Sequence, residues 1–502
     1  MLIKSKNKNQ LKKRNFSKYF KFLKNKSSKI LFLVFYSIIL ISATSGFGQD
    51  YLKFLIRRLG LVEIKDDIKE KILFISKPDN LINTPKNWIM ALPKEIDNFY
   101  ININYENLNK LNNKRKEALK KGVLISKDSD FVNAKITFGQ NQYKASIRLK
   151  GDLTDHLEHP KKWSFRIKLK NKEVIYGINK FSLQTPHTRN YIWEKVFHLL
   201  LKEKGLPSLK YKYVNLFVNG DNLGTYALEQ HFDKILIESN KNKEGPIIAL
   251  SEDFLWENIE SQSQNGNLIY DENQAFFSSP IKVFKKNKIY SDPFLGAAYL
   301  KASKNIREFQ KGNLKTSEVF DVNKLSIFFA ITDLVNSWHS SRWHNQRFYF
   351  DPYSMFLIPI GFDSMSGGIN GNEKLKELSI ERFSDNEKRQ ELPFFEDLIF
   401  VESYLKELDR LISEPFIENF LLENKKIINT DIAKIHKSYP HQKDFSHITK
   451  ALKTNKLIIY DNLYPKYELV DSYITNSETF KVLNIGNMYH LPLEIIGIKY
   501  KG

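Results

Sequence analysis

The sequence predicts a mixed α+β fold, because strand patterns concentrate in its first half and helical patterns in its second half. Side chains from Trp163 to Leu169 alternate between apolar and polar, which is the period of a strand with one buried face. Residues 322–338 instead form a long apolar run that is typical of a buried helix, and 376–463 is mostly helical in pattern. A chain of 502 residues is expected to form two or three domains.

The N-terminus combines a basic tail with an apolar segment. Residues 1–29 hold eleven Lys or Arg and no acidic residue, which accounts for about half of the formal net charge of +21. The apolar segment 30–47 is near the lower length limit of a membrane helix. This order predicts a cytoplasmic tail, followed by a signal anchor that stays or a signal peptide that is cleaved. The rest is then expected on the extracytoplasmic side, membrane-anchored or, after cleavage, secreted.

Composition excludes several classes of function. The chain has no cysteine, so disulfides, thiolate catalysis and cysteine-bound metals are excluded. Outside the basic tail the net charge is about +10, which is ordinary for a body of this size. We therefore expect no nucleic-acid partner.

The remaining elements follow in order along the chain. Residues 48–135 are expected to be a juxtamembrane and connecting region, and the main domain is expected over 136–465. Residues 240–292 read as an insertion or mobile connection, and 466–502 as a short β module that is truncated in this chain. The predicted elements of the main domain are paired strands at 138–149, a strand at 163–169, a helix at 188–205, a hairpin at 213–228, the helix 322–338 and a hairpin at 346–360.

A candidate metal site follows the helix 322–338. A polar loop contains His339 and Asn345, and an isolated Asp363 follows the next predicted hairpin. Protein kinases place an Asn and a metal-binding Asp in this order. Mg²⁺ prefers oxygen ligands from few residues, so Asn345 and Asp363 could supply two. Two histidines and an Asp in the loop 151–160 are weaker metal candidates, because a polar loop often contains such residues without binding metal.

Three stretches resemble blocks of the spore-coat protein H (CotH) kinase family, a family of atypical secreted or surface kinases. They are Arg148 to Gly151 with Pro160 to Lys168, then Gly205 to Pro207 with Tyr213 to Gly220 and Gly224 to Glu229, and finally His344-Asn345 with Pro359 to Asp363. Together they cover roughly residues 135–370. The resemblance implies a two-lobed, atypical protein-kinase-like domain that uses ATP and Mg²⁺.

The resemblance also implies roles for single residues. Arg166 and Lys168 would contact the nucleotide, and Glu229 would hold the lysine, while Asn345 and Asp363 would hold the metal. A solvated basic face is the alternative for Lys168, and Glu194 is an alternative partner for the lysine.

The chain departs from the family pattern at two positions. His339 stands near the place of the usual catalytic Asp, and Gly361 replaces one Asp of a Pro-Trp-Asp-x-Asp motif. Imidazole titrates near neutral pH, so His339 could act as a general base. Two functions stay open: phosphoryl transfer to an envelope or surface protein, or an inactive pseudokinase scaffold in envelope or surface-polymer assembly. Since ATP is scarce outside the cytoplasm, another phosphoryl donor stays open as well.

Overall fold

The computed structural model describes residues 78–262, 276–368, 371, 373–384, 393–413, 415–476 and 479–497, which fall into two compact units. In the smaller unit, helix α5 (Pro78–Ala91) contacts the loop Tyr439–Gln442. The Asn87 side chain donates to the carbonyl oxygens of Pro440 at 3.0 Å and Gln442 at 3.3 Å. Within the described ranges, no helix has both the length and the apolar content needed to cross a membrane. The apolar segment 30–47 and residues 48–77 of the expected connecting region lie outside these ranges.

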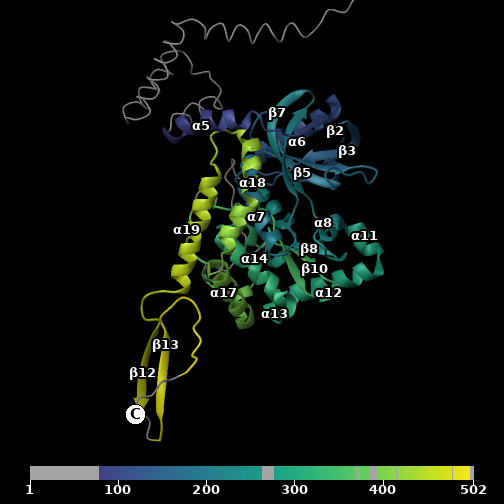
Figure 1. Ribbon diagram of the computed structural model, residues 1–502. Coiled ribbons are helices and arrows are strands. Elements are labelled where there is room, and N and C mark those ends of the chain that lie inside the picture. The colour runs from purple at the N-terminus through teal and green to yellow at the C-terminus, as the bar shows by residue number, and fades with distance from the viewer. Residues whose placement is uncertain are drawn as a thin grey trace, which may run out of the picture. The chain divides into compact units, whose positions relative to one another are not determined.

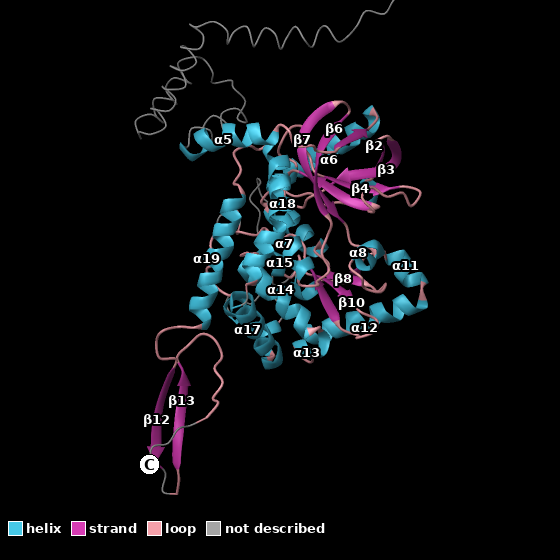
Figure 2. Ribbon diagram, in the orientation of Figure 1, coloured by secondary structure: helices cyan, strands magenta, loops and turns pink. Residues whose placement is uncertain are grey.

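The larger unit contains a closed seven-stranded barrel (Figures 1 and 2). Its neighbouring strands are antiparallel except for β1 and β6, which are parallel, and the order around the barrel is β1-β2-β3-β4-β5-β7-β6. The strands are β1 (Asn98–Asn102), β2 (Val132–Phe138), β3 (Asn141–Leu149), β4 (Phe165–Leu169), β5 (Lys180–Gln184), β6 (Tyr211–Val218) and β7 (Asp221–Gln230).

The alternation seen in the sequence sorts the side chains of the barrel into two faces. On β4, Phe165, Ile167 and Leu169 are buried in the barrel core, while Arg166 and Lys168 lie on the outer face. The predicted strand at 163–169 is thus confirmed, although it begins at Phe165. Successive side chains of a strand point to opposite faces. The residues of β3 and β5 that pair with Arg166, and the residue of β7 that pairs with that position of β5, therefore lie on the same outer face.

Helices and a second sheet make up the rest of the larger unit. The sheet has the order β11-β10-β8-β9. Its strands are β8 (Ile247–Leu250), β9 (Ile281–Val283), β10 (Arg347–Phe350) and β11 (Leu357–Ile360). The α-helices are α6 (Tyr105–Lys121), α7 (Trp193–Glu203), α8 (Lys234–Ser239), α9 (Asp253–Gln262), α11 (Lys286–Ser291), α12 (Pro293–Gln310), α13 (Thr316–Val319), α14 (Val322–Leu334), α15 (Trp338–Ser341), α16 (Ser379–Ser384), α17 (Leu398–Ser413), α18 (Phe416–His436) and α19 (Phe445–Leu463). Short 3₁₀ turns are η2 (Asp128–Asp130), η3 (Thr154–His156), η4 (Pro186–Arg189) and η5 (Phe394–Glu396).

The structure confirms the mixed α+β class and corrects one expectation about the chain. The described part of 240–292 does not behave as a loose insertion, because β8 pairs with both β10 and β9 inside the second sheet. Helix α14 is apolar on all sides, as expected of a buried helix, and packs against α17.

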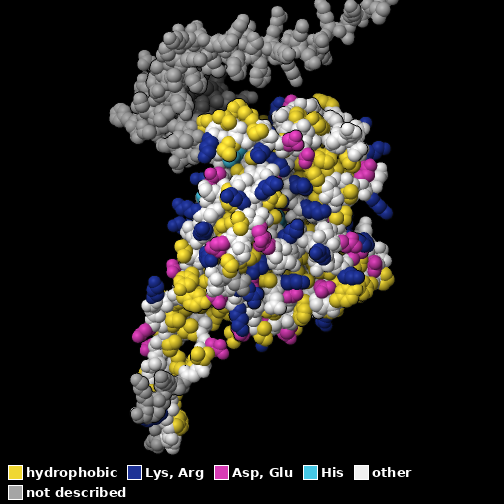
Figure 3. Space-filling model, in the orientation of Figure 1, with side chains coloured by type: hydrophobic (Ala, Val, Ile, Leu, Met, Phe, Trp, Pro, Cys, Tyr) yellow, Lys and Arg dark blue, Asp and Glu magenta, His cyan; other side chains and the backbone are white. Residues whose placement is uncertain are grey.

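The C-terminal segment forms a hairpin of β12 (Val470–Asn476) and β13 (Lys481–Asn487). Large apolar side chains are exposed on it, including Ile474, Leu483 and Ile485, and Figure 3 shows hydrophobic side chains on its surface. Within the described residues, β12 and β13 pair only with each other and leave apolar surface exposed, and an isolated two-stranded hairpin is marginally stable in water.

Stability should depend on the inner face of the barrel. Ile167→Ala is expected to lower the free energy of unfolding by roughly 2–5 kcal/mol, because its fully buried side chain leaves a cavity in the barrel core. Lys144→Ala on the exposed face of neighbouring β3 is the control, with an expected change within about 0.5 kcal/mol. Urea unfolding measures both, and equal effects would contradict this account of the core.

Candidate functional site

A buried ion pair lies on the outer face of the barrel, where the barrel meets the helices. The ammonium of Lys150, directly after β3, is 3.0 Å from a carboxylate oxygen of Glu229 on β7, and it also donates to Gln184 on β5. Burial lowers the pKa of Lys150 to about 8, although Glu229 opposes this effect. Burial would raise the pKa of Glu229, but Lys150 and Arg189 outweigh it and hold that pKa at about 2.

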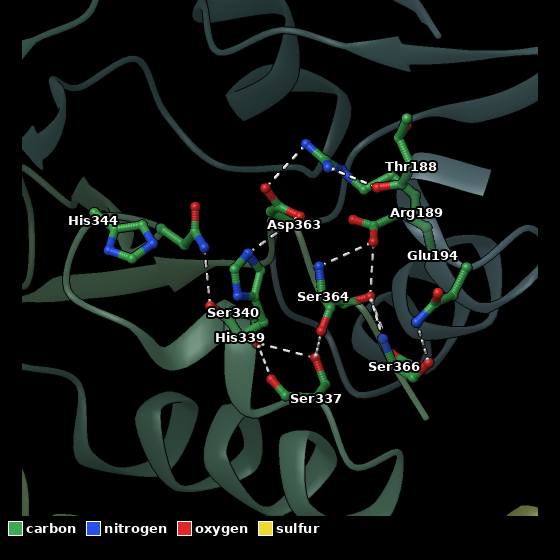
Figure 4. A network of polar contacts seen from close by, with 12 residues as sticks. Thr188, Arg189, Glu194, Ser337, His339, Ser340, His344, Asp363, Ser364 and Ser366 are labelled. Atoms are coloured by element: carbon green, nitrogen blue, oxygen red, sulfur yellow. Dashed lines mark hydrogen bonds and ion pairs between the residues drawn. The ribbon is translucent and has the colours of Figure 1, made fainter. Parts of the chain in front are cut away.

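Arg189 connects this pair to the helical part of the unit. Its Nη2 is 3.0 Å from Asp363 Oδ2, and its Nε is 3.7 Å from Glu229 Oε1 (Figure 4 shows the Asp363 side of this link). A third contact, at 2.9 Å, runs from Nη1 to the carbonyl oxygen of Thr188. Burial disfavours the charged guanidinium, but Asp363 and Glu229 more than compensate, so the pKa of Arg189 is raised.

His339, Asn345 and Asp363 meet at the helical side of this network. Asp363 follows β11 with a left-handed φ of +52°, and its Oδ1 is buried without a hydrogen-bond partner. His339 Nε2 is 3.8 Å from that oxygen (Figure 4), and the Asn345 side chain donates to the His339 carbonyl at 3.0 Å. Burial lowers the pKa of His339 in spite of the nearby Asp363, so the imidazole is neutral at pH 7.

Glu194 holds the loop that carries Asp363. Its Oε2 accepts hydrogen bonds from the Ser364 backbone at 2.9 Å and from the Ser364 hydroxyl at 2.7 Å, and Ser337 donates to the Ser364 carbonyl at 2.8 Å (Figure 4). Helix α7 and the turn after α14 are thereby tied to the residue that follows Asp363. In the structure Glu194 therefore binds this loop, and it does not take the alternative role of pairing with a lysine.

The residues singled out from the sequence are brought together with one exception. Arg166 and Glu229 both lie beside Ser182 in the strand register, on the same outer face, so these two charges are close. Lys168 is farther out: its side chain is 37% exposed and pairs with Asp128 at 3.2 Å. The lysine that pairs with Glu229 is Lys150, for which the sequence predicts no role although it lies within the Arg148 to Gly151 block.

The weaker metal candidates have ordinary structural roles. His156 is buried against the Ser164 hydroxyl at 2.8 Å, and His159 accepts from backbone amides two and three residues later. Across the described residues, no group of three or more His, Asp or Glu side chains is arranged to hold a metal ion. Within the described ranges, a metal at Asp363 would therefore need ligands other than His, Asp and Glu side chains.

Gly361 is required by the packing of helix α7. A Cβ atom at this position would overlap Leu201 Cδ1 and would lie 2.8 Å from Phe197 Cε1, and both side chains belong to α7. There is consequently no space for the aspartate that the related motif has here. The missing carboxylate reflects how α7 packs against the end of β11.

Fold and site together describe an α+β protein in which charged side chains from a barrel and from a helical part form one buried network. A family model described as CotH kinase protein matches residues 147–476, a range that includes Lys150, Glu229, Asn345 and Asp363. The chain therefore belongs to the CotH kinase family. A search of curated proteins finds no match to the chain.

The packing at Gly361 can be tested by a double-mutant cycle. Gly361→Ala is expected to cost roughly 1–3 kcal/mol of stability, because the new methyl group overlaps Leu201. In a Leu201→Ala background the same change should cost much less, since space has been made. Gly486→Ala in the hairpin, where the Cβ would meet only the Asp471 carbonyl at 3.7 Å, is the control. Thermal and urea unfolding measure the coupling; purely additive losses would contradict the steric explanation.

Proposed function

We propose that this protein is an atypical kinase-like domain that binds a nucleoside triphosphate, ATP in the first instance, together with one Mg²⁺ ion. In this proposal the barrel and the helical part act as two lobes around the nucleotide. The observation that carries it is the continuous network from Lys150 and Glu229 through Arg189 to Asp363. A buried lysine–glutamate pair next to a loop carboxylate is what phosphoryl transfer requires for placing phosphate groups.

The side chains fit one metal ion and not two. Asp363 Oδ1 is a buried acceptor without a hydrogen-bond partner, and the Asn345 amide nitrogen donates to the His339 carbonyl, so the Asn345 amide oxygen would be the second ligand. Mg²⁺ commonly binds one or two protein oxygens plus phosphates and water, so this pair suffices. A second carboxylate at position 361 is excluded by α7. When bound, Mg·ATP would supply the γ-phosphoryl group and a cation to offset its charge.

The role proposed for each residue follows from its position in the network. Lys150 and Arg166 lie on the barrel side and would attract phosphate oxygens. His339 lies beside Asp363 with its imidazole neutral, so it can accept a proton from an acceptor hydroxyl. Arg189 would keep Glu229 and Asp363 at a fixed separation.

A pseudokinase scaffold is the second candidate, and specific observations favour it. The usual catalytic Asp is replaced near His339, one metal-region Asp is Gly361, and the remaining Asp363 is already paired with Arg189 at 3.0 Å. Each of these features weakens transfer without preventing nucleotide binding. We infer that catalysis by the natural sequence is weak or absent.

The cellular setting proposed for either function is extracytoplasmic. The basic tail 1–29 and the apolar segment 30–47 are the support, since together they resemble an export signal. The acceptor or partner would accordingly be an envelope or surface protein.

Nucleotide binding is tested by Asp363 and His339 variants. We expect Asp363→Asn and Asp363→Ala to lose Mg²⁺-dependent ATP binding, since they remove the carboxylate that the metal requires. His339→Ala should bind ATP nearly as the unmodified protein does, and His339→Asp should raise phosphoryl transfer by restoring a carboxylate. Thermal shift with and without Mg²⁺ reports binding, and radiolabelled transfer reports activity.

Glu106→Ala is the matched control, because it removes an exposed acid of α6 that pairs with the exposed Lys110 at 2.7 Å. If the unmodified protein transfers phosphoryl groups and His339→Ala does so equally well, the general base is a residue other than His339. An absence of ATP binding in every protein would refute the nucleotide site and leave the scaffold.

Export is tested by a reporter fused after residue 502. The apolar segment 30–47 predicts activity of a reporter that works only outside the cytoplasm, and deleting residues 30–47 should abolish it. Activity of a cytoplasm-specific reporter in the intact fusion would overturn the proposed setting.

A further inference from the structure

Basic side chains crowd the outer face of strands β3, β4 and β5, next to the site already described. Arg148 on β3 lies directly opposite Arg166 on β4, and Lys168 on β4 lies directly opposite Lys180 on β5. Like charges at directly opposed positions of a sheet repel one another. Two such pairs on adjacent strands therefore need an explanation beyond surface solubility.

The partners of these four side chains offset their charge only in part. Within the described residues, Lys168 alone among them has a carboxylate at ion-pair distance, that of Asp128 at 3.2 Å. Asp152 acts on both Arg148 and Arg166 from farther away, and Glu229 acts on Arg166. Arg148 donates to its neighbouring backbone carbonyl at 3.1 Å, and its Nε is buried without a hydrogen-bond partner. Arg166 donates to a ring nitrogen of His231, whose pKa burial and Arg166 hold far below its usual value, so that ring adds no negative charge.

Lys180 is the least compensated of the four. It is half-buried, and within the described ranges it makes no ion pair and no side-chain hydrogen bond. A further cation, Lys285, approaches from the turn after β9, whereas the acids whose fields reach Lys180 are Asp128 and Asp233. Burial and then the cations Arg166, Lys168 and Lys285 lower the pKa of Lys180 to about 6.

We propose that this face, defined by Arg148, Arg166, Lys168 and Lys180, is a binding site for a chain of phosphate groups. A row of four cations, of which one has a carboxylate at ion-pair distance within the described residues, is complementary to an anion with several charges in a line. The row adjoins the Lys150–Glu229 pair through Arg166. The ligand is either the triphosphate tail of a nucleotide, which rests on the proposed function, or an inorganic polyphosphate, which does not.

Binding at this face is coupled to proton uptake. Without ligand, Lys180 is mostly neutral above its lowered pKa, and a bound polyanion restores its charged form. Affinity should therefore rise as the pH falls from 8 to 6. Because the pKa of Lys180 is lower in the folded chain than in the unfolded chain, the unfolded chain binds more protons between pH 8 and pH 6. The free energy of unfolding of the ligand-free protein therefore falls as the pH falls toward 6.

The test is titration calorimetry of the full-length chain with tripolyphosphate in the absence of Mg²⁺, at pH 6 and pH 8. We expect at least tenfold tighter binding at pH 6, with proton uptake visible in buffers of different ionisation enthalpy. Lys180→Met should weaken binding at pH 6 by tenfold or more and reduce the difference in affinity between pH 6 and pH 8. The remaining difference is assigned to Asp152, whose pKa burial raises to about 7 near Arg148 and Arg166, and to protonation of tripolyphosphate itself. The same variant should melt at a higher temperature, which shows that it is folded.

Lys144→Met is the matched control. Lys144 also lies opposite a lysine, Lys135 on β2, but both side chains are exposed to water. This variant should bind tripolyphosphate as the unmodified protein does. Unchanged affinity of Lys180→Met, or no binding of tripolyphosphate at pH 6, would overturn the proposal.

Competition with ATP separates the two ligands. Displacement of tripolyphosphate by ATP assigns the face to a nucleotide tail, and simultaneous binding assigns it to a separate polyphosphate. Asp363→Asn separates this proposal from the preceding one, because it should lose Mg²⁺-dependent ATP binding yet keep metal-free tripolyphosphate binding. Loss of both ligands in Asp363→Asn would contradict the independence of the phosphate-binding face.

Discussion

The buried guanidinium of Arg189 is the interaction on which the rest of the site depends. A charge of this kind is tolerated in a protein interior only when opposite charges and hydrogen-bond acceptors surround it. The barrel supplies Glu229 and the helical part supplies Asp363, so neither part alone satisfies the arginine. This requirement ties the position of the loop after β11 to that of β7. Gln184 and Lys150 then complete the shell around Glu229.

The sequence allowed much of this arrangement to be predicted where the signal was local. Alternation identified β4, and the resemblance led to Glu229, Asn345 and Asp363 without any knowledge of distances. The pairing of Lys150 could not be found in this way. Lys150 and Lys168 both lie on the outer face, and only the register of β3, β4 and β5 decides which of them reaches Glu229.

Long-range pairing also explains the wrong expectation for 240–292. The stretch is polar overall, and the apolar run that forms β8 is four residues long. Such a short run gains a defined structure from its partner strands, which are β9 at the end of the same stretch and β10, about a hundred residues away in the sequence. The polar composition of 240–292 therefore reflects the residues around β8 and does not reveal the strand.

The backbone at Asp363 constrains how this position can change over evolutionary time. Its left-handed φ of +52° is unfavourable for most side chains, but Asn and Gly adopt it at low cost. Among single replacements, these two preserve the turn most easily, whereas β-branched or bulky residues strain it. A descendant that discards the carboxylate would most readily carry Asn or Gly there, with the turn intact and Arg189 left with Glu229 as its remaining counter-charge. Replacement of Asp363 by Asn or Gly would thus remove the carboxylate while the backbone turn is kept.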